Sequence, residues 1–75
     1  MAATPLKLAR KKAGKKQEEL AAAAGVSQAH ISCLENLTER ASPVVAEKIA
    51  AYLGRDLITE EQILYPERFM EQQAA

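Results

Sequence analysis

Six cationic side chains with no acid among them stand at the start of the sequence, where they could bind an anion. The first 16 residues carry a charge of +6, from Lys7, Arg10, Lys11, Lys12, Lys15 and Lys16. The rest of the chain holds ten acids against four cations and carries −6, so the whole chain is formally neutral. Clustered Lys and Arg side chains neutralise phosphates. A neutral composition by itself would argue against a nucleic-acid partner. The order of the charges along the chain keeps that partner possible.

Two other side chains, His30 and Cys33, could do chemistry because they stand at positions i and i+3 of a helix. They could bind a metal ion or form a nucleophile pair. A structural zinc site needs four ligands, however, and the chain has no further His or Cys. Nothing else in the sequence suggests a catalytic pocket. We therefore expect no metal, no cofactor and no enzyme activity, and a single Cys also excludes an intrachain disulfide.

The elements that must position these residues are helices. Ala, Leu, Glu, Lys and Gln dominate, and no alternating run of β-branched and aromatic residues predicts a strand. Capping residues, prolines and glycines divide the chain into five short helices, at about 5–13, 17–24, 27–36, 43–53 and 59–65. With 75 residues, of which 48% are hydrophobic, the chain is expected to form one small all-α domain.

The most informative stretch runs from Gln17 to Asn36 and predicts two short helices joined by a tight turn. Ala21 allows the two helices to approach closely, Gly25 allows a positive φ at the turn, and Val26 fills the angle between the helices. Facing apolar side chains come from both helices: Leu20, Ala24, Ile31 and Leu34. All these requirements are met at consistent spacings, so the stretch predicts a helix-turn-helix.

This stretch resembles the helix-turn-helix of the phage repressor and Cro group, known as the XRE family. The resemblance covers about residues 6–64 and implies a compact five-helix bundle of the lambda-repressor-like DNA-binding type. It also implies a partly buried salt bridge between Arg10 and Glu35, on the first and third helices. Gln17 matches a residue that contacts a phosphate and packs against the recognition helix, and Gln28 matches the first base-reading residue.

The chain departs from the family pattern at the end of the third helix. Leu37 follows Asn36 where the family often has Gly. The helix could therefore end with Asn36 in the left-handed conformation or run one residue further, which leaves the geometry of the 38–42 loop open. His30 and Cys33 stand where polar reading residues are more usual, so base specificity is expected to depend on Gln28 and on DNA shape.

The chemistry of the third helix fits entry into a major groove with its N-terminus first. The Gln28 amide can pair with adenine N6 and N7, and the Ala29 methyl can contact a thymine methyl. The expected base-reading residues are Gln28, Ala29, Ser32 and Cys33. The residues expected to contact the DNA backbone are Gln17, Ser27, Asn36, Lys11, Lys15, Lys16, Thr38 and Arg40.

The sequence thus predicts a sequence-specific DNA-binding transcriptional regulator, a small repressor that occupies an operator. The alternative is a protein-binding module of the same fold, an antitoxin-like or repressor-antagonist partner. Residues 1–66 form the expected DNA-binding domain, with the helix-turn-helix at 17–36. Residues 67–75 form a polar tail, frayed or associated with a dimer.

Homodimerisation on double-stranded operator DNA is expected from the small size of the module and from the family. The candidate dimer contacts are Ile58, Ile63, Leu64, Tyr65 and Phe69, and the aromatic Tyr52, Tyr65 and Phe69 are interpreted as core and dimer contacts. The longest stretch without a charge, residues 20–34, contains four polar residues and predicts no membrane span. No secretory signal is recognisable, so the expected location is the cytoplasm.

Overall fold

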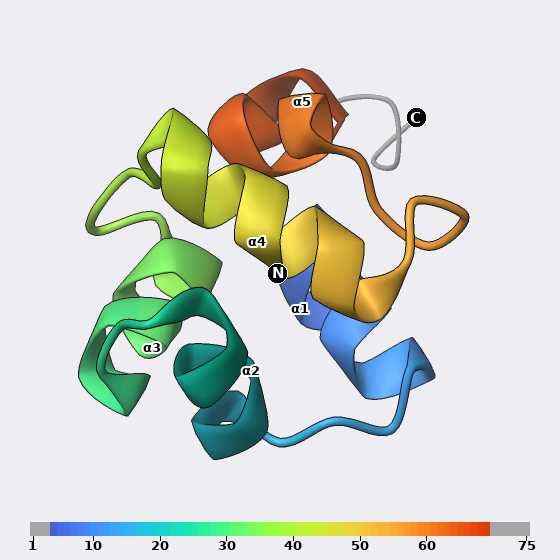
Figure 1. The fold of residues 1–75 in the computed structure, drawn as a ribbon. Coiled ribbons are helices and arrows are strands. Elements are labelled where there is room, and N and C mark those ends of the chain that lie inside the picture. The colour runs from blue at the N-terminus through green and yellow to red at the C-terminus, as the bar shows by residue number, and fades with distance from the viewer. Residues whose placement is uncertain (1–3, 70–75) are drawn as a thin grey trace.

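The computed structural model describes residues 4–69, and over that range all the regular elements are helices. The helices are α1 (Pro5–Lys12), α2 (Gln17–Ala24), α3 (Gln28–Asn36), α4 (Pro43–Leu53) and α5 (Glu60–Leu64). Figure 1 shows α4 crossing the middle of the molecule in front of α1, with α2 and α3 on one side and α5 on another. The predicted all-α bundle is confirmed.

Capping side chains set where the helices begin. Thr4, Ser27, Ser42 and Thr59 each accept a hydrogen bond from a backbone N–H three residues further on. Gln62 completes the capping box by accepting from the Thr59 backbone N–H at 2.9 Å. Such caps satisfy N–H groups that have no partner inside the helix. The predicted helix starts at these four positions are confirmed.

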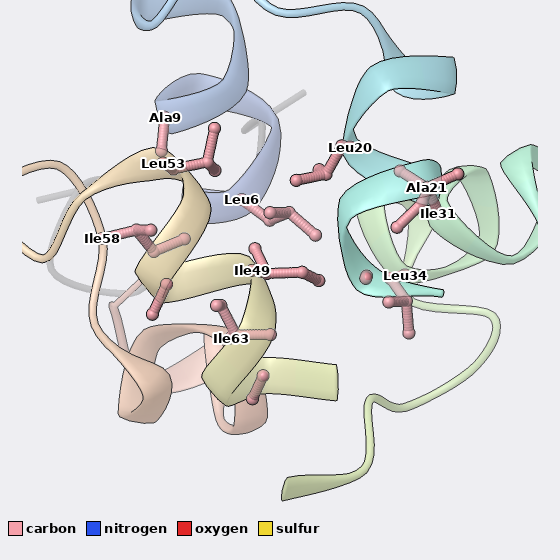
Figure 2. Close-up of a cluster of buried hydrophobic side chains, with 13 residues drawn as sticks. Leu6, Ala9, Leu20, Ala21, Ile31, Leu34, Ile49, Leu53, Ile58 and Ile63 are labelled. Atoms are coloured by element: carbon pink, nitrogen blue, oxygen red, sulfur yellow. The ribbon is translucent and has the colours of Figure 1, made fainter. Parts of the chain in front are cut away.

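The core is formed by aliphatic side chains that converge from all five helices (Figure 2). The fully buried large side chains are Leu20, Ile31, Ile49 and Ile58. On α4, Ala46 and Ala50 are buried beside Ile49, whereas Val45 is only half-buried. Burial of such side chains contributes about 1.5–3 kcal/mol each. This burial holds α3 against α2, and α2 against α4.

Both helices of the helix-turn-helix end in the same backbone motif. After α2, the N–H of Val26 donates to Ala21 O at 3.0 Å and that of Gly25 donates to Ala22 O at 3.3 Å. Gly25 adopts φ +72°, the left-handed conformation that this Schellman motif requires. The turn that fixes α3 relative to α2 is therefore built from local backbone bonds, and the prediction for Gly25 is confirmed.

Leu37 occupies the corresponding position after α3, with φ +63° and ψ +24°. Its neighbour Thr38 donates its backbone N–H to Cys33 O at 3.0 Å, which completes a second Schellman motif. Of the two endings left open by the sequence, the structure has the longer one, because Asn36 is still helical. The 38–42 loop therefore starts from a leucine in a conformation that usually requires glycine.

Replacing Leu37 by glycine is expected to relieve the strain of its left-handed backbone. A left-handed L-residue costs about 1–2 kcal/mol, whereas glycine adds about 0.5–1 kcal/mol of chain entropy to the unfolded state. Leu37 is 43% exposed, so glycine also loses the contacts of the covered part of the side chain. Leu37→Ala loses nearly the same contacts but keeps the strained φ, so it is the matched control. Leu37→Gly should be more stable than Leu37→Ala by about 0.5 kcal/mol, which is about 2–4 °C in melting temperature. A melting temperature of Leu37→Gly at or below that of Leu37→Ala would contradict this account.

Two expectations for the end of the chain are wrong. Pro66 does not end the helical structure but opens a further helical turn at 66–69. Ile58 and Ile63 are 1% and 6% exposed, so as core residues they have no surface to offer a partner. Of the aromatic residues interpreted as core and dimer contacts, Tyr52 and Tyr65 are 38% and 46% exposed, so they are not core residues, and their role as dimer contacts stays a prediction. Residues 70–75 of the tail lie outside the described range.

Candidate nucleic-acid interface

A bidentate ion pair between Arg10 and Glu35 joins α1 to α3. Arg10 Nε donates to Glu35 Oε2 at 2.6 Å, and Arg10 Nη2 donates to Oε1 at 3.2 Å. The two side chains are 12% and 1% exposed. Arg10 Nη1 also donates to the backbone carbonyl of Lys15 at 2.9 Å, so the same guanidinium fixes the loop between α1 and α2. The salt bridge that the family resemblance implied is present.

Gln17, the first residue of α2, links this ion pair to the surface of α3. Its Nε2 donates to Glu35 Oε1 at 3.0 Å, and its Oε1 accepts from Gln28 Nε2 at 3.5 Å. An uninterrupted chain of polar contacts therefore runs from Arg10 through Glu35 and Gln17 to Gln28. These contacts orient the Gln28 amide from the protein side. The sequence indicated that Gln17 packs against the recognition helix, but not that it orients Gln28.

A shallow basic cleft of about 480 Å³ opens between α1, the loop after it and the starts of α2 and α3. Its lining consists of Lys7, Arg10, Lys15, Lys16, Gln17, Glu18 and Gln28. Lys15 Nζ lies 5.5 Å from the centre of the Tyr52 ring, so a cation–π contact holds this lysine over α4. Of the predicted phosphate contacts, the structure brings Lys15, Lys16 and Gln17 together beside Gln28, while Lys11 is exposed outside the cleft.

The outer face of α3 presents the predicted base-reading residues. Gln28 and Ala29 are exposed in its first turn, and Ser32 and Cys33 are half-buried one turn further along. Ser27 accepts the His30 backbone N–H at 3.1 Å and so is engaged as the N-cap. These positions share the side of the helix that faces away from the core residues Ile31 and Leu34. The arrangement leaves an amide, a methyl and two small polar side chains available to base edges.

The predicted backbone contacts at the far end of α3 are tied into the protein. Asn36 Nδ2 donates to Ser32 Oγ at 3.4 Å, and Thr38 Oγ1 donates to Cys33 O at 3.3 Å. Arg40 turns towards the end of the chain, where its Nη2 lies 2.7 Å from Glu67 Oε1. The hydrogen bond from Arg40 holds the pKa of Glu67 below its ordinary value. Arg40 is thus directed away from the basic cleft. The sequence could not indicate this direction.

A second contact that the sequence missed ties the 38–42 loop to α3. His30 Nδ1 lies 2.6 Å from Glu39 Oε2, and the side chains are 27% and 52% exposed. The sequence did not indicate Glu39 as a partner of His30. Within residues 4–69, no three His, Cys, Asp or Glu side chains are grouped so that they could hold a metal ion. None of the helices formed by those residues has the length and apolar character needed to cross a membrane.

Comparison with known proteins agrees with this geometry. The family described as "Helix-turn-helix" matches residues 6–58, which cover nearly all of α1, the whole of α2, α3 and α4, and the polar contacts from Arg10 to Gln28. Searches of curated proteins and of solved structures found no match. The match spans well over half of the sequence. The chain belongs to the XRE/Cro-like helix-turn-helix family, a family of DNA-binding regulators.

Proposed function

We propose that the protein is a sequence-specific transcriptional regulator, a small repressor that acts by occupying operator DNA. The observation that supports this most is the basic cleft beside the exposed first turn of α3. A major groove admits an α-helix, and phosphates border the groove on both sides. A helix that offers Gln28 and Ala29 while lysines flank its N-terminus matches that distribution of charge and hydrogen-bonding groups.

The chemistry of each side chain suggests which part of the DNA it contacts. Gln28 and Ala29 read bases, with Ser32 and Cys33 contributing from the next turn. Lys15, Lys16 and Gln17 bind one phosphate backbone together with the N–H groups at the start of α2. Lys11, Ser27, Asn36, Thr38 and Arg40 contact the backbone on either side. For Arg40, contact requires release from Glu67, because the phosphate and the carboxylate compete for one guanidinium.

Binding as a homodimer is part of the proposal. Helix α3 has nine residues and is about 14 Å long, so it spans part of one groove. Two copies on half-sites about 34 Å apart would supply the second reading helix. Of the remaining candidate contacts, Leu64, Tyr65 and Phe69, Leu64 lines a groove of about 210 Å³. The other residues that line this groove are Leu37, Glu39, Arg40, Pro66 and Glu67.

Replacing Lys16 by glutamine tests the phosphate-binding role of the basic cleft. Binding to every duplex should weaken, and the slope of log affinity against log salt should fall by about one unit because one phosphate contact is lost. Fluorescence anisotropy with a labelled duplex at several salt concentrations measures both. Arg55→Gln removes the same charge from the loop after α4, where Arg55 pairs with Glu60, and should leave the slope unchanged.

The outcome separates the two candidate functions. If the unmodified protein is not retained on duplex DNA even at low salt, DNA binding is excluded and the protein-binding module becomes the better account. If Lys16→Gln and Arg55→Gln reduce the slope equally, the attraction to DNA is a property of net charge and not of the basic cleft.

A further inference from the structure

The pair of His30 and Glu39 carries a titratable proton on the surface proposed to bind DNA. Nδ1 of His30 lies 2.6 Å from Glu39 Oε2. An ionised carboxylate only accepts hydrogen bonds, so Nδ1 must carry the hydrogen in this contact. The second ring nitrogen, Nε2, has no hydrogen-bond partner among residues 4–69, and the side chain is 27% exposed. Nε2 is therefore the ring nitrogen that is open to a further partner.

The other charged groups around this pair are engaged elsewhere or lie at a distance along their helices. On α3 itself, Glu35 is bound to Arg10 and Gln17. In the loop, Arg40 is bound to Glu67. From α4, Lys48 Nζ approaches Gly25 at the end of α2. The acids of α2, Glu18 and Glu19, belong to its first turn, and its last turn carries no charge. Glu39 is thus the charged side chain that contacts His30.

The protonation state of Nε2 decides both the charge of the pair and its hydrogen-bonding character. With Nε2 unprotonated, the pair carries −1 and Nε2 can only accept a hydrogen bond. With Nε2 protonated, the pair is neutral and Nε2 becomes a donor. Phosphate oxygens are negatively charged and accept hydrogen bonds only. The unprotonated pair therefore repels a DNA backbone, whereas the protonated pair can donate to it.

We propose that the protein takes up a proton at the His30–Glu39 pair when it binds duplex DNA, so that the protonated pair is the DNA-binding form. This inference rests on the proposed function and adds a regulation to it. His30 belongs to the helix that carries Gln28 and Ala29, and Glu39 lies between the proposed backbone contacts Thr38 and Arg40. Both partners of the pair thus belong to elements that approach DNA in the proposed complex.

The sign of the pH dependence follows from the proton balance. The DNA complex holds more protons than the free protein, so a lower pH favours the complex. Histidine side chains titrate between about pH 5 and 8. Within this window the affinity for DNA should rise as the pH falls, by up to about tenfold for each pH unit if one proton is taken up. A drop from about pH 7.5 to about pH 6 should therefore tighten binding by at least about fivefold.

Anisotropy titrations of one labelled duplex from about pH 6 to about pH 7.5, at constant salt, test this directly. His30→Gln keeps a side-chain donor for Glu39 but cannot titrate, so its affinity should be independent of pH. Glu39→Gln removes the negative charge and should tighten binding at the high end of the range. Glu47→Gln removes the same charge from the exposed surface of α4 and should not. Because His30 is the sole histidine in the sequence, its ring NMR signals also report its protonation without overlap.

Each result has a distinct meaning. A pH-dependent affinity that His30→Gln abolishes, with a His30 NMR titration that moves to higher pH on adding DNA, supports the proposal. Binding that does not change with pH, or that changes equally in His30→Gln, overturns the proton uptake and leaves the proposed function intact. Absence of binding to any duplex at low salt and at every pH overturns the proposed function and this inference with it.

Discussion

Replacing Arg10 by alanine is expected to lower the free energy of unfolding by about 3–5 kcal/mol, the largest effect of any single substitution considered. The change leaves the Glu35 carboxylate, whose side chain is 1% exposed, without its charge partner. It also removes the hydrogen bond that holds the Lys15 carbonyl. A buried carboxylate that loses its partner keeps the cost of desolvation without the compensating attraction. The fold of a domain this small should be close to its limit of stability.

Urea denaturation followed by circular dichroism measures this effect. Arg55→Ala is the matched control, because it breaks the exposed ion pair with Glu60, in which the side chains are 55% and 44% exposed. Surface pairs of that kind contribute less than about 1 kcal/mol. If Arg10→Ala unfolds at the same urea concentration as the unmodified protein, the pair does not hold α1 to α3 as described.

The second large effect is expected for Gln28→Ala, which should reduce discrimination at one base pair by about 1–3 kcal/mol. The Gln28 side chain is exposed and in contact with Gln17, so its loss removes a reading group without exposing the core. Affinity for random DNA should change little, because the phosphate contacts remain. The fold should also remain intact, in contrast to Arg10→Ala.

Competition titrations with duplexes that carry each of the four base pairs at the affected position measure this change. The unmodified protein should prefer one of them, and Gln28→Ala should bind the four more evenly. An equal loss of affinity on the preferred duplex and on random DNA would show that Gln28 does not read a base.

Much of the fold could be predicted from the sequence because local chemistry dictates it. Thr4, Ser27, Ser42 and Thr59 cap helices wherever their hydroxyls meet unpaired N–H groups, and this depends on neighbours three residues away. Gly25 likewise marks a left-handed turn by its own conformational freedom. The long-range pair of Arg10 and Glu35 was accessible only through the family resemblance, since nothing local in the sequence joins residues 25 positions apart.

What could not be predicted depends on how distant segments meet. Isoleucine suits a dimer contact as well as a core, so the residue types of Ile58 and Ile63 do not decide between the two. Only the packing of α5, and of the segment before it, places both in the core. Arg40 meets Glu67, and His30 meets Glu39, because the 38–42 loop folds back after the left-handed Leu37. The left-handed end of a helix is recognised in a sequence by glycine or asparagine. A leucine at that position therefore does not predict the left-handed conformation.

Selection of bound duplexes from a random pool, followed by anisotropy titration of the enriched duplex and a scrambled one, tests the central claim most directly. The account predicts an enriched sequence with two-fold symmetry, half-sites about one helical turn apart, and affinity for it at least about 1,000-fold above that for the scrambled duplex. Recovery of no common sequence, with equal binding to both duplexes or to neither, would contradict a sequence-specific regulator.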